Sequence, residues 1–153
     1  MNEKASSSAF RVLLVEDNDD DVLLTRNAFR KLPVVVDLHV VRDGLEAFKF
    51  LRHEAPYDDA LLPHIILLDL NMPRMNGRRF LVELKKDEHL KIIPTVVLTT
   101  SAAEDDVSSA YQSQASAYMT KPMDINEFAY RTRCFASFWL SDVAILPTRL
   151  KAI

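Results

Sequence analysis

Five polar residues, each at or just after the end of a short apolar run, have side chains that could together act on a phosphate group. They are Glu16, Asp17, Asp69, Thr99 and Lys121. Singly, each has an ordinary explanation, because an Asp after an apolar run is usually a loop or helix-capping residue and a Lys is usually solvated. Three carboxylates at one site, however, repel one another unless a cation lies among them, and oxygen ligands favour Mg²⁺. Together the five residues predict a magnesium site.

A carboxylate beside Mg²⁺ can attack phosphorus and form an acyl phosphate, while the metal and a lysine ammonium neutralise the oxygens that gain charge. This chemistry makes Asp69 the nucleophile and phospho-acceptor, and Lys121 the fixed positive charge. Asp17 is then a direct metal ligand, and Glu16 is a ligand that acts through water. The Thr99 hydroxyl could bond a phosphate oxygen, so an added charge of roughly −2 would pull its strand end inward. The predicted protein is a phospho-acceptor switch and not an enzyme.

These side chains can meet only if the chain folds as an α/β protein with its apolar runs side by side. Short β-branched or leucine-rich runs, too brief for helices, recur at residues 12–15, 38–41, 65–68, 96–99 and 117–119. Stretches with apolar residues at helical spacing lie between them, for example Val22, Phe29 and Leu32. This alternation predicts a doubly wound, five-stranded parallel sheet with helices on both faces and a ligand crevice at the carboxyl ends of its strands.

The composition argues against several classes of protein. The 19 Lys and Arg residues are balanced by 22 Asp and Glu, so we expect no nucleic-acid binding. Only Gly44 and Gly77 occur, which excludes a P-loop and a dinucleotide fingerprint. Cys134 is the single cysteine, and no apolar stretch approaches the roughly 18 residues of a membrane span. We therefore expect a soluble, cytoplasmic protein of one domain, whose four scattered histidines are surface or loop residues and not a zinc site.

Several motifs, in this order and spacing, resemble the receiver domains of two-component response regulators. The motifs are VLLVEDN at residues 12–18, Asp43-Gly44, IILLDLNMPRMNG at 65–77, VVLTTS at 96–101 and YMTKP at 118–122. The resemblance covers nearly the whole span from residue 11 to about residue 140. It implies the flavodoxin-like (CheY-like) receiver fold with strand order 2-1-3-4-5, and it implies that Asp69 accepts phosphate from the phosphohistidine of a histidine kinase.

The same resemblance implies roles for three further features of the chain. Asn71 is implied to give its backbone carbonyl to Mg²⁺, and the Lys121-Pro122 bond is implied to be cis. Tyr118 is implied to be a switch aromatic that turns inward when Thr99 moves. The alternative for Tyr118 is a half-exposed strand residue without a switching role.

The last thirty or so residues hold more apolar side chains than a single covering helix needs. Apolar or small residues at helical spacing run from Ile125 to Leu146, and Pro147 is predicted to end this extended helix. Such a helix either folds back on its own sheet or buries its second face against another copy or a partner. The predicted contact residues are Phe135, Phe138, Trp139, Leu140 and Leu146.

This tail resembles that of the small stand-alone regulators encoded beside bacterial phytochrome kinases. The resemblance implies a light-sensing histidine kinase as partner and a homodimer formed through the last helix and tail. The expected organisation is a flexible arm at residues 1–9, a receiver domain at residues 10–140 and a C-terminal extension at residues 141–153.

Two other functions use similar residues. A phosphatase of the haloacid-dehalogenase type also has an aspartyl nucleophile with Mg²⁺, but it needs a second Asp where this chain has Asn71, which cannot act as a general acid and base. A receiver-like module that only docks has no physical reason to keep all five polar residues. Both alternatives are therefore disfavoured.

Overall fold

In the computed structural model of the chain, residues 9–147 are described. Five parallel strands form one sheet in the order β2-β1-β3-β4-β5. Their bounds are β1 Phe10–Val15, β2 Val36–Val41, β3 Ile65–Leu68, β4 Thr95–Thr99 and β5 Ala117–Thr120. Each strand contains or coincides with one of the apolar runs seen in the sequence, so the fold class and the strand order are confirmed.

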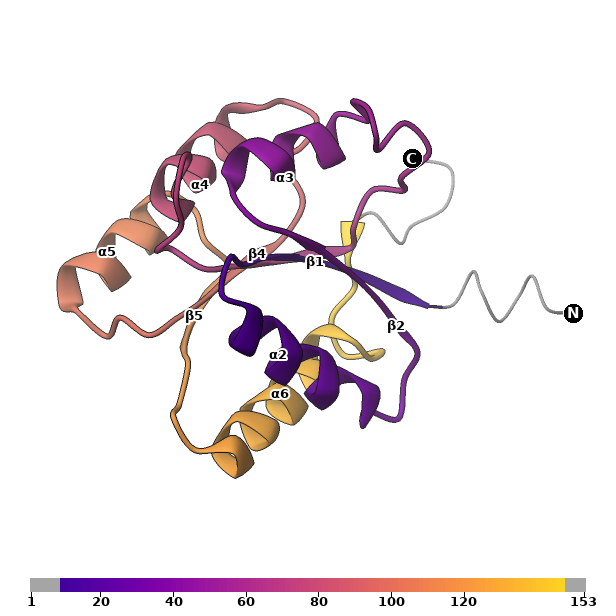
Figure 1. Ribbon diagram of the computed structural model, residues 1–153, viewed down its shortest axis with the longest axis vertical. Coiled ribbons are helices and arrows are strands. Elements are labelled where there is room, and N and C mark those ends of the chain that lie inside the picture. Colours follow the sequence, from indigo (N-terminus) through magenta and orange to yellow (C-terminus); the bar gives the residue numbers. More distant parts are fainter. Residues whose placement is uncertain (1–8, 148–153) are drawn as a thin grey trace, which may run out of the picture.

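Five helices cover the sheet within the described residues, and Figure 1 shows them in two layers. The helices α2 and α6 lie on one face, and α3, α4 and α5 lie on the other. Their bounds are α2 Asp19–Arg30, α3 Gly44–Leu51, α4 Gly77–Lys86, α5 Glu104–Gln112 and α6 Ile125–Trp139. None of these helices is long and apolar enough to cross a membrane.

The burial of the strands explains their composition. All four residues of β3 are buried, because this strand lies in the middle of the sheet and both of its faces are covered by helices. Only the last residue of β2, an edge strand, is fully buried, and its remaining residues alternate between half-buried and exposed. The core clusters on the two faces of the sheet therefore enclose the paired strands β1 and β3, whose carboxyl ends lie side by side.

Short polar side chains begin most of the helices at defined residues. The Asn18 side chain accepts a hydrogen bond from the Asp21 amide (3.0 Å), and the Asp43 side chain accepts one from the Glu46 amide (2.9 Å). Asn76 and Asp124 cap α4 and α6 in the same way. Three of these caps follow β1, β2 and β3, so they place the first turns of α2, α3 and α4 beside the carboxyl ends of the sheet.

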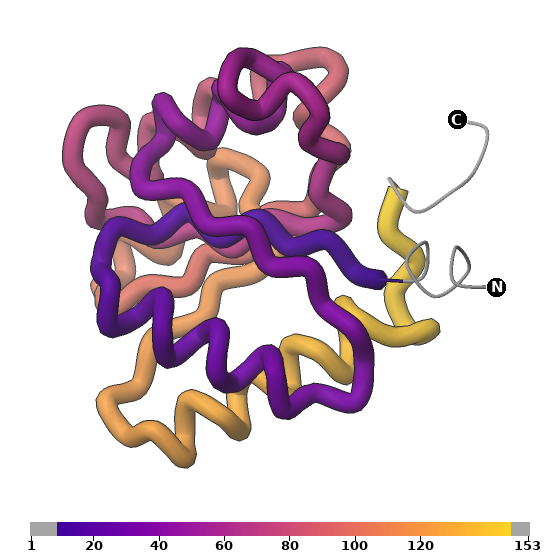
Figure 2. Tube along the Cα trace, turned by 45° about the vertical axis from the view of Figure 1, so that its right-hand side comes forward, coloured from indigo at the N-terminus to yellow at the C-terminus, as the bar shows by residue number. Residues whose placement is uncertain are grey.

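The prediction that the last helix continues to Pro147 was wrong, because α6 ends at Trp139. Beyond Leu140, the Ser141 hydroxyl donates to the Ser137 carbonyl (2.7 Å) and accepts from the Val143 amide (3.2 Å). Such local side-chain bonds compete with helix hydrogen bonds and favour a turn. The residues after α6 therefore turn back, and Figure 2 shows this segment at the end of the molecule where β1 begins.

Three of the five predicted partner-contact residues lie inside the chain's own core. Phe135, Leu140 and Leu146 are buried in the cluster between the sheet and the α2 and α6 helices, and Leu146 is only 2% exposed. Their burial removes them as exposed contacts, because the turn after Trp139 brings Leu146 back onto the sheet. Trp139 is half-buried against the same cluster, whereas Phe138 is 48% exposed. Of the five, Phe138 is the one that offers a free apolar surface in the described residues.

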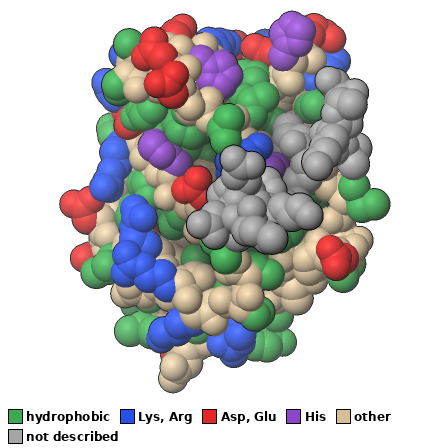
Figure 3. Space-filling view, turned by 90° about the vertical axis from the view of Figure 1, so that its right-hand side faces the viewer, with side chains coloured by type: hydrophobic (Ala, Val, Ile, Leu, Met, Phe, Trp, Pro, Cys, Tyr) green, Lys and Arg blue, Asp and Glu red, His purple; other side chains and the backbone are tan. Residues whose placement is uncertain are grey.

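Figure 3 looks onto the end of the molecule where the described chain begins and ends. Hydrophobic side chains are visible there among acidic and basic ones. The expected arm at residues 1–9 and extension at residues 141–153 lie partly outside the described residues. Within residues 141–147, Val143 and Ile145 are exposed.

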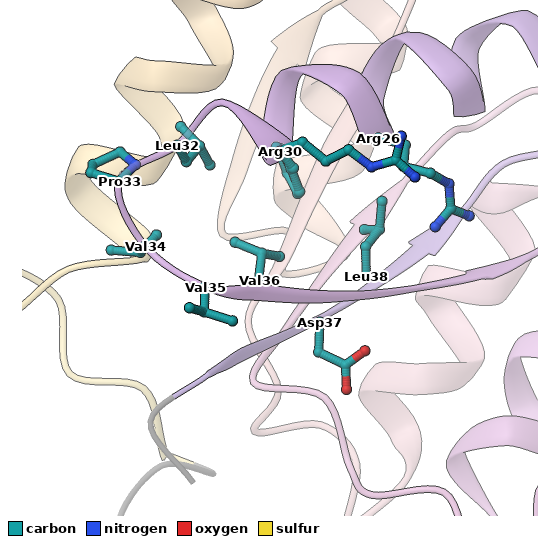
Figure 4. A pocket seen from close by; sticks show the side chains of 10 residues that line it. Arg26, Arg30, Leu32, Pro33, Val34, Val35, Val36, Asp37 and Leu38 are labelled. Atoms are coloured by element: carbon teal, nitrogen blue, oxygen red, sulfur yellow. The ribbon is translucent and has the colours of Figure 1, made fainter. Parts of the chain in front are cut away.

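A cavity of about 540 Å³ lies at the amino end of β2, beside the last turn of α2. Figure 4 shows Val36 and Leu38 directed toward α2, Asp37 directed to the opposite side of the strand, and Arg26 and Arg30 extending from the helix. None of the predicted site residues lines this cavity. It lies at the end of the sheet opposite to the predicted crevice, so it takes no part in the site described next.

Candidate metal and phospho-acceptor site

Three carboxylates gather at the carboxyl ends of β1 and β3, as the sequence predicts. Glu16 and Asp17 directly follow β1, and Asp69 directly follows β3, which is paired with β1. One oxygen from each of the three carboxylates lies within 4.8 Å of the other two. Glu16 and Asp69 are buried, and Asp17 is exposed. The group is thus a small acidic pocket open on the Asp17 side, with the donor set that a hard divalent cation prefers.

The electrostatics of this pocket show why a cation fits it. Burial, together with a hydrogen bond between the Glu16 and Asp69 carboxyl groups, raises the pKa of Glu16 to about 8, and the Lys121 ammonium opposes part of the rise. Two buried carboxylates this close are hard to ionise together, so a proton compensates for the missing positive charge. A divalent ion would replace that proton. The contact of Glu16 with the ion through water stays a prediction.

Lys121 is buried among acidic groups, with a side chain that is 6% exposed. Its ammonium donates to Glu16 and to Asp21 (2.9 Å to Oδ2), and it lies 3.5 Å from Oδ2 of Asp69. Burial alone would lower the pKa of Lys121, but the bonds to Glu16 and Asp21 raise it above the ordinary value. The predicted fixed positive charge is therefore present beside the predicted nucleophile. The Lys121 amide also donates to the Thr99 carbonyl (2.8 Å), which ties β5 to the end of β4.

Thr99 and Asn71 complete the rim of the pocket. Thr99 is fully buried at the end of β4, and its hydroxyl oxygen accepts a long hydrogen bond from the Asn71 side-chain amide (3.5 Å). The Asn71 backbone amide donates to Oδ1 of Asp69 (3.3 Å). All five polar residues predicted from the sequence thus belong to one neighbourhood. The use of the Asn71 carbonyl as a metal ligand stays a prediction.

Tyr118 lies on β5 with its ring half-buried against the core cluster under α3, α4 and α5. Its hydroxyl donates to the Ser101 carbonyl (2.9 Å). The Ser101 hydroxyl in turn donates to Asp106 (2.5 Å), and Asp106 is paired with Arg78 (3.0 Å). The ring is therefore linked through polar contacts to the loop that follows Thr99, which agrees with either of its two interpretations.

The loop after Asp69 is fixed on two sides. A side chain at Gly77 could not fit, because an added Cβ would lie 2.1 Å from the Asp69 carbonyl oxygen. Arg74, which has a positive φ of 59°, forms an ion pair with the buried Asp43. The Gly44 amide donates to the Met75 carbonyl (3.0 Å). The Asp43-Gly44 motif of the sequence thus anchors the loop that carries Asp69.

The expected isomer of one X-Pro bond was wrong. The Lys121-Pro122 bond is trans, and among the described residues the cis bond is Ala55-Pro56. The trans isomer is the lower-energy form of an X-Pro bond by about 0.5–1 kcal/mol. His64 lies in the loop before β3, which agrees with the expectation of a surface or loop residue, and it is buried there with its Nδ1 accepting a hydrogen bond from the Arg11 amide (2.8 Å).

The contact of Asp21 with Lys121 was not predicted from the sequence. Asp21 follows Asp19 and Asp20, and three acidic residues in the first turn of a helix look like ordinary partners of the helix dipole. The structure separates the three, since Asp21 bonds Lys121 and Asp19 bonds Arg42 (2.5 Å). Only their different directions around α2 distinguish them, and the sequence gives no sign of which one faces the lysine.

The sequence pattern of the response regulator receiver domain matches residues 12–133, which is most of the chain. The chain belongs to this family. This receiver is 39% identical over 134 residues to response regulator Rcp1 of Synechocystis sp., an alignment that covers 88% of this chain and 91% of Rcp1.

Solved structures agree with the assignment. The phosphorylated cyanobacterial phytochrome response regulator RcpA is 40% identical and superposes with a TM-score of 0.86, covering 91% of this chain and 99% of RcpA. The Mn²⁺-bound form of Rcp1 is 38% identical and has a TM-score of 0.84, covering 90% of this chain and 99% of that structure. Receiver domains take phosphoryl groups from histidine kinases, so this chain is a response regulator of phosphorylation-based two-component signalling. Rcp1, a member of the family, has been solved with Mn²⁺ bound, and this chain has a group of three carboxylates that could hold such a divalent ion.

Proposed function

We propose that Asp69 is the phospho-acceptor of this receiver and that the reaction uses Mg²⁺ held by Glu16, Asp17, Asp69 and the backbone carbonyl of Asn71. The observation that supports the proposal best is the meeting of three carboxylates within 4.8 Å beside a buried ammonium. The ion would neutralise charge on the phosphoryl oxygens and hold them near the acceptor. The chain's own residues carry the remaining roles.

In the proposed step, a carboxylate oxygen of Asp69 attacks the phosphorus of a phosphohistidine on a histidine kinase. The new P–O bond forms as the P–N bond breaks, and the imidazole nitrogen leaves with the electron pair. Lys121, whose ammonium is 3.5 Å from Asp69, offsets the charge on the transferred oxygens. The product is an aspartyl phosphate, and the receiver acts as a switch and not as an enzyme that turns over outside substrates.

The signal would leave the site through Thr99 and Tyr118. The buried Thr99 hydroxyl, which accepts a hydrogen bond from the Asn71 side-chain amide, would donate its own hydrogen to a phosphoryl oxygen. Movement of Thr99 would pull the loop that holds Ser101, whose carbonyl accepts the Tyr118 hydroxyl bond. Breaking this bond would free the ring to turn inward and change the surface formed by α5 and β5.

For the upstream partner we propose a light-sensing histidine kinase of the phytochrome type. The likeness to RcpA, which is a phytochrome response regulator, supports this assignment. Such a pathway places the receiver in the cytoplasm. We also propose a homodimer, with Phe138 as its exposed apolar contact and no binding of nucleic acid.

The test of the site is incubation with Mg²⁺ and acetyl phosphate, followed by intact-mass measurement. We expect one added phosphoryl group, which is lost in Asp69→Asn and in the absence of Mg²⁺. Asp59→Asn, which removes an exposed carboxylate in the loop before β3, is the control and keeps the modification. An unmodified wild-type chain would refute the proposal, and multiple release of phosphate from varied substrates would favour a phosphatase.

A further inference from the structure

The Lys121 ammonium has three carboxylate neighbours, and one of them stands apart from the metal group. Its hydrogen bonds go to Glu16 and Asp21, while Asp69 lies farther away at 3.5 Å. Asp21 is not one of the three clustered carboxylates. The lysine is therefore held between a predicted metal ligand and a separate acidic side chain, and it makes no hydrogen bond with the acceptor itself.

Asp21 is held in place by its backbone. Its amide donates to the Asn18 side chain (3.0 Å), and its carbonyl accepts the Thr25 hydroxyl (2.8 Å), which fixes the first turn of α2. Its side chain is 31% exposed, whereas the Lys121 side chain is 6% exposed. Because the turn is fixed by its own bonds, Asp21 can stay in position when the other partners of Lys121 change.

Phosphorylation would change those partners. The transferred group brings roughly two negative charges and three acceptor oxygens next to Asp69. Glu16 would be occupied by the metal, since its oxygen belongs to the clustered group. The acceptors for the ammonium that lie outside the metal group are then the Asp21 carboxylate and the phosphoryl oxygens.

We propose that Asp21 competes with the phosphoryl group for the Lys121 ammonium and so weakens the phosphorylated state. The inference rests on the function proposed above and adds a residue that tunes it. Asp21 touches the lysine and not the phosphoryl group, so it acts by positioning. Its carboxylate also adds a negative charge near the incoming anion, which acts in the same direction.

The proposal predicts that Asp21→Asn changes the affinities for an anion and for a cation in opposite directions. Removing one negative charge should strengthen the binding of an anion at Asp69 and weaken the binding of a cation among the carboxylates. A variant that merely damaged the fold would weaken both. The two affinities therefore separate the proposed competition from a structural role.

The experiment measures the affinity of the full chain for beryllofluoride, a phosphoryl analogue, at saturating Mg²⁺, and separately its affinity for Mg²⁺ alone. Both can be followed by calorimetric titration. We expect Asp21→Asn to bind beryllofluoride roughly fivefold more tightly than the wild type, as for loss of one partly exposed ion pair. We expect it to bind Mg²⁺ more weakly.

Asp20→Asn is the matched control, because Asp20 lies on the same turn, is exposed, and carries the same charge. It should change the beryllofluoride affinity by less than about twofold, as a surface charge without direct contact. If Asp21→Asn folds poorly, the same titrations are made with Asp21→Ala. Thermal melts of both variants show whether they are folded.

Equal or weaker beryllofluoride binding in folded Asp21→Asn and Asp21→Ala, relative to Asp20→Asn, would overturn the competition. If the wild-type chain bound no beryllofluoride with Mg²⁺ present, the proposed phospho-acceptor function itself would fail. The two failures are therefore distinguishable.

Discussion

Replacing Leu146 by alanine tests whether the segment after α6 belongs to the chain's own core. The Leu146 side chain is 2% exposed and lies in the cluster that contains Phe10, Phe135 and Leu140. Truncating a buried leucine typically costs about 2–5 kcal/mol, and we expect about 3 kcal/mol here because a site near the chain end can partly collapse. For a chain of this size that loss lowers Tm by about 6–12 °C.

The measurement is urea and thermal unfolding followed by circular dichroism. Ile145→Ala is the matched control, because Ile145 is the preceding residue and is 78% exposed. Its free energy of unfolding should stay within about 0.5 kcal/mol of the wild-type value. If Leu146→Ala were as stable as this control but lost the dimer in light scattering, Leu146 would be an interface residue and the assignment to the core would be refuted.

Three further predictions address the site and the surface. Because the raised pKa of Glu16 keeps a proton in the pocket below pH about 8, Mg²⁺ affinity should increase as the pH rises toward that value, and a titration independent of pH would contradict this. Gly77→Ala places a Cβ 2.1 Å from the Asp69 carbonyl oxygen, so we expect slower phosphorylation by acetyl phosphate in the folded variant together with a lower Tm; unchanged values of both would count against the close contact. Phe138→Ser should shift the mass in light scattering from dimer to monomer with little change in Tm, and a persistent dimer would remove Phe138 as the contact.

The sheet and the five clustered polar residues could be predicted from the sequence because each rests on a strong local signal. The Ile65–Leu68 run is apolar throughout, which is required of a central parallel strand, and Asp69 follows it directly. Parallel strands end at the same edge, so the convergence of the polar residues follows from the fold class. These inferences needed no knowledge of side-chain directions.

The end of α6 and the role of Asp21 could not be predicted in this way. The apolar spacing continues beyond Trp139, but the hydroxyl bonds of Ser141 break the helix, and periodicity does not register such bonds. Asp21 differs from its acidic neighbours only by facing Lys121, a contact across 100 residues of sequence. Both features depend on tertiary geometry that a local pattern does not contain.

The loop after Asp69 and the loop after Thr99, which flank the pocket, are anchored by different contacts. On one flank, the Arg74–Asp43 ion pair and the bond from Gly44 to Met75 join this loop to the buried start of α3. On the other flank, the loop after Thr99 is joined to its surroundings through Ser101, Asp106 and the half-buried Tyr118. Asp43 on the α3 flank is fully buried, whereas Asp106 and Tyr118 on the α5 flank are half-buried, so we expect new charge at Asp69 to displace the α5 flank more. We expect phosphorylation to change the surface near α5 and to leave the surface near α3 unchanged. A downstream partner that distinguishes the two states would then bind on the α5 side.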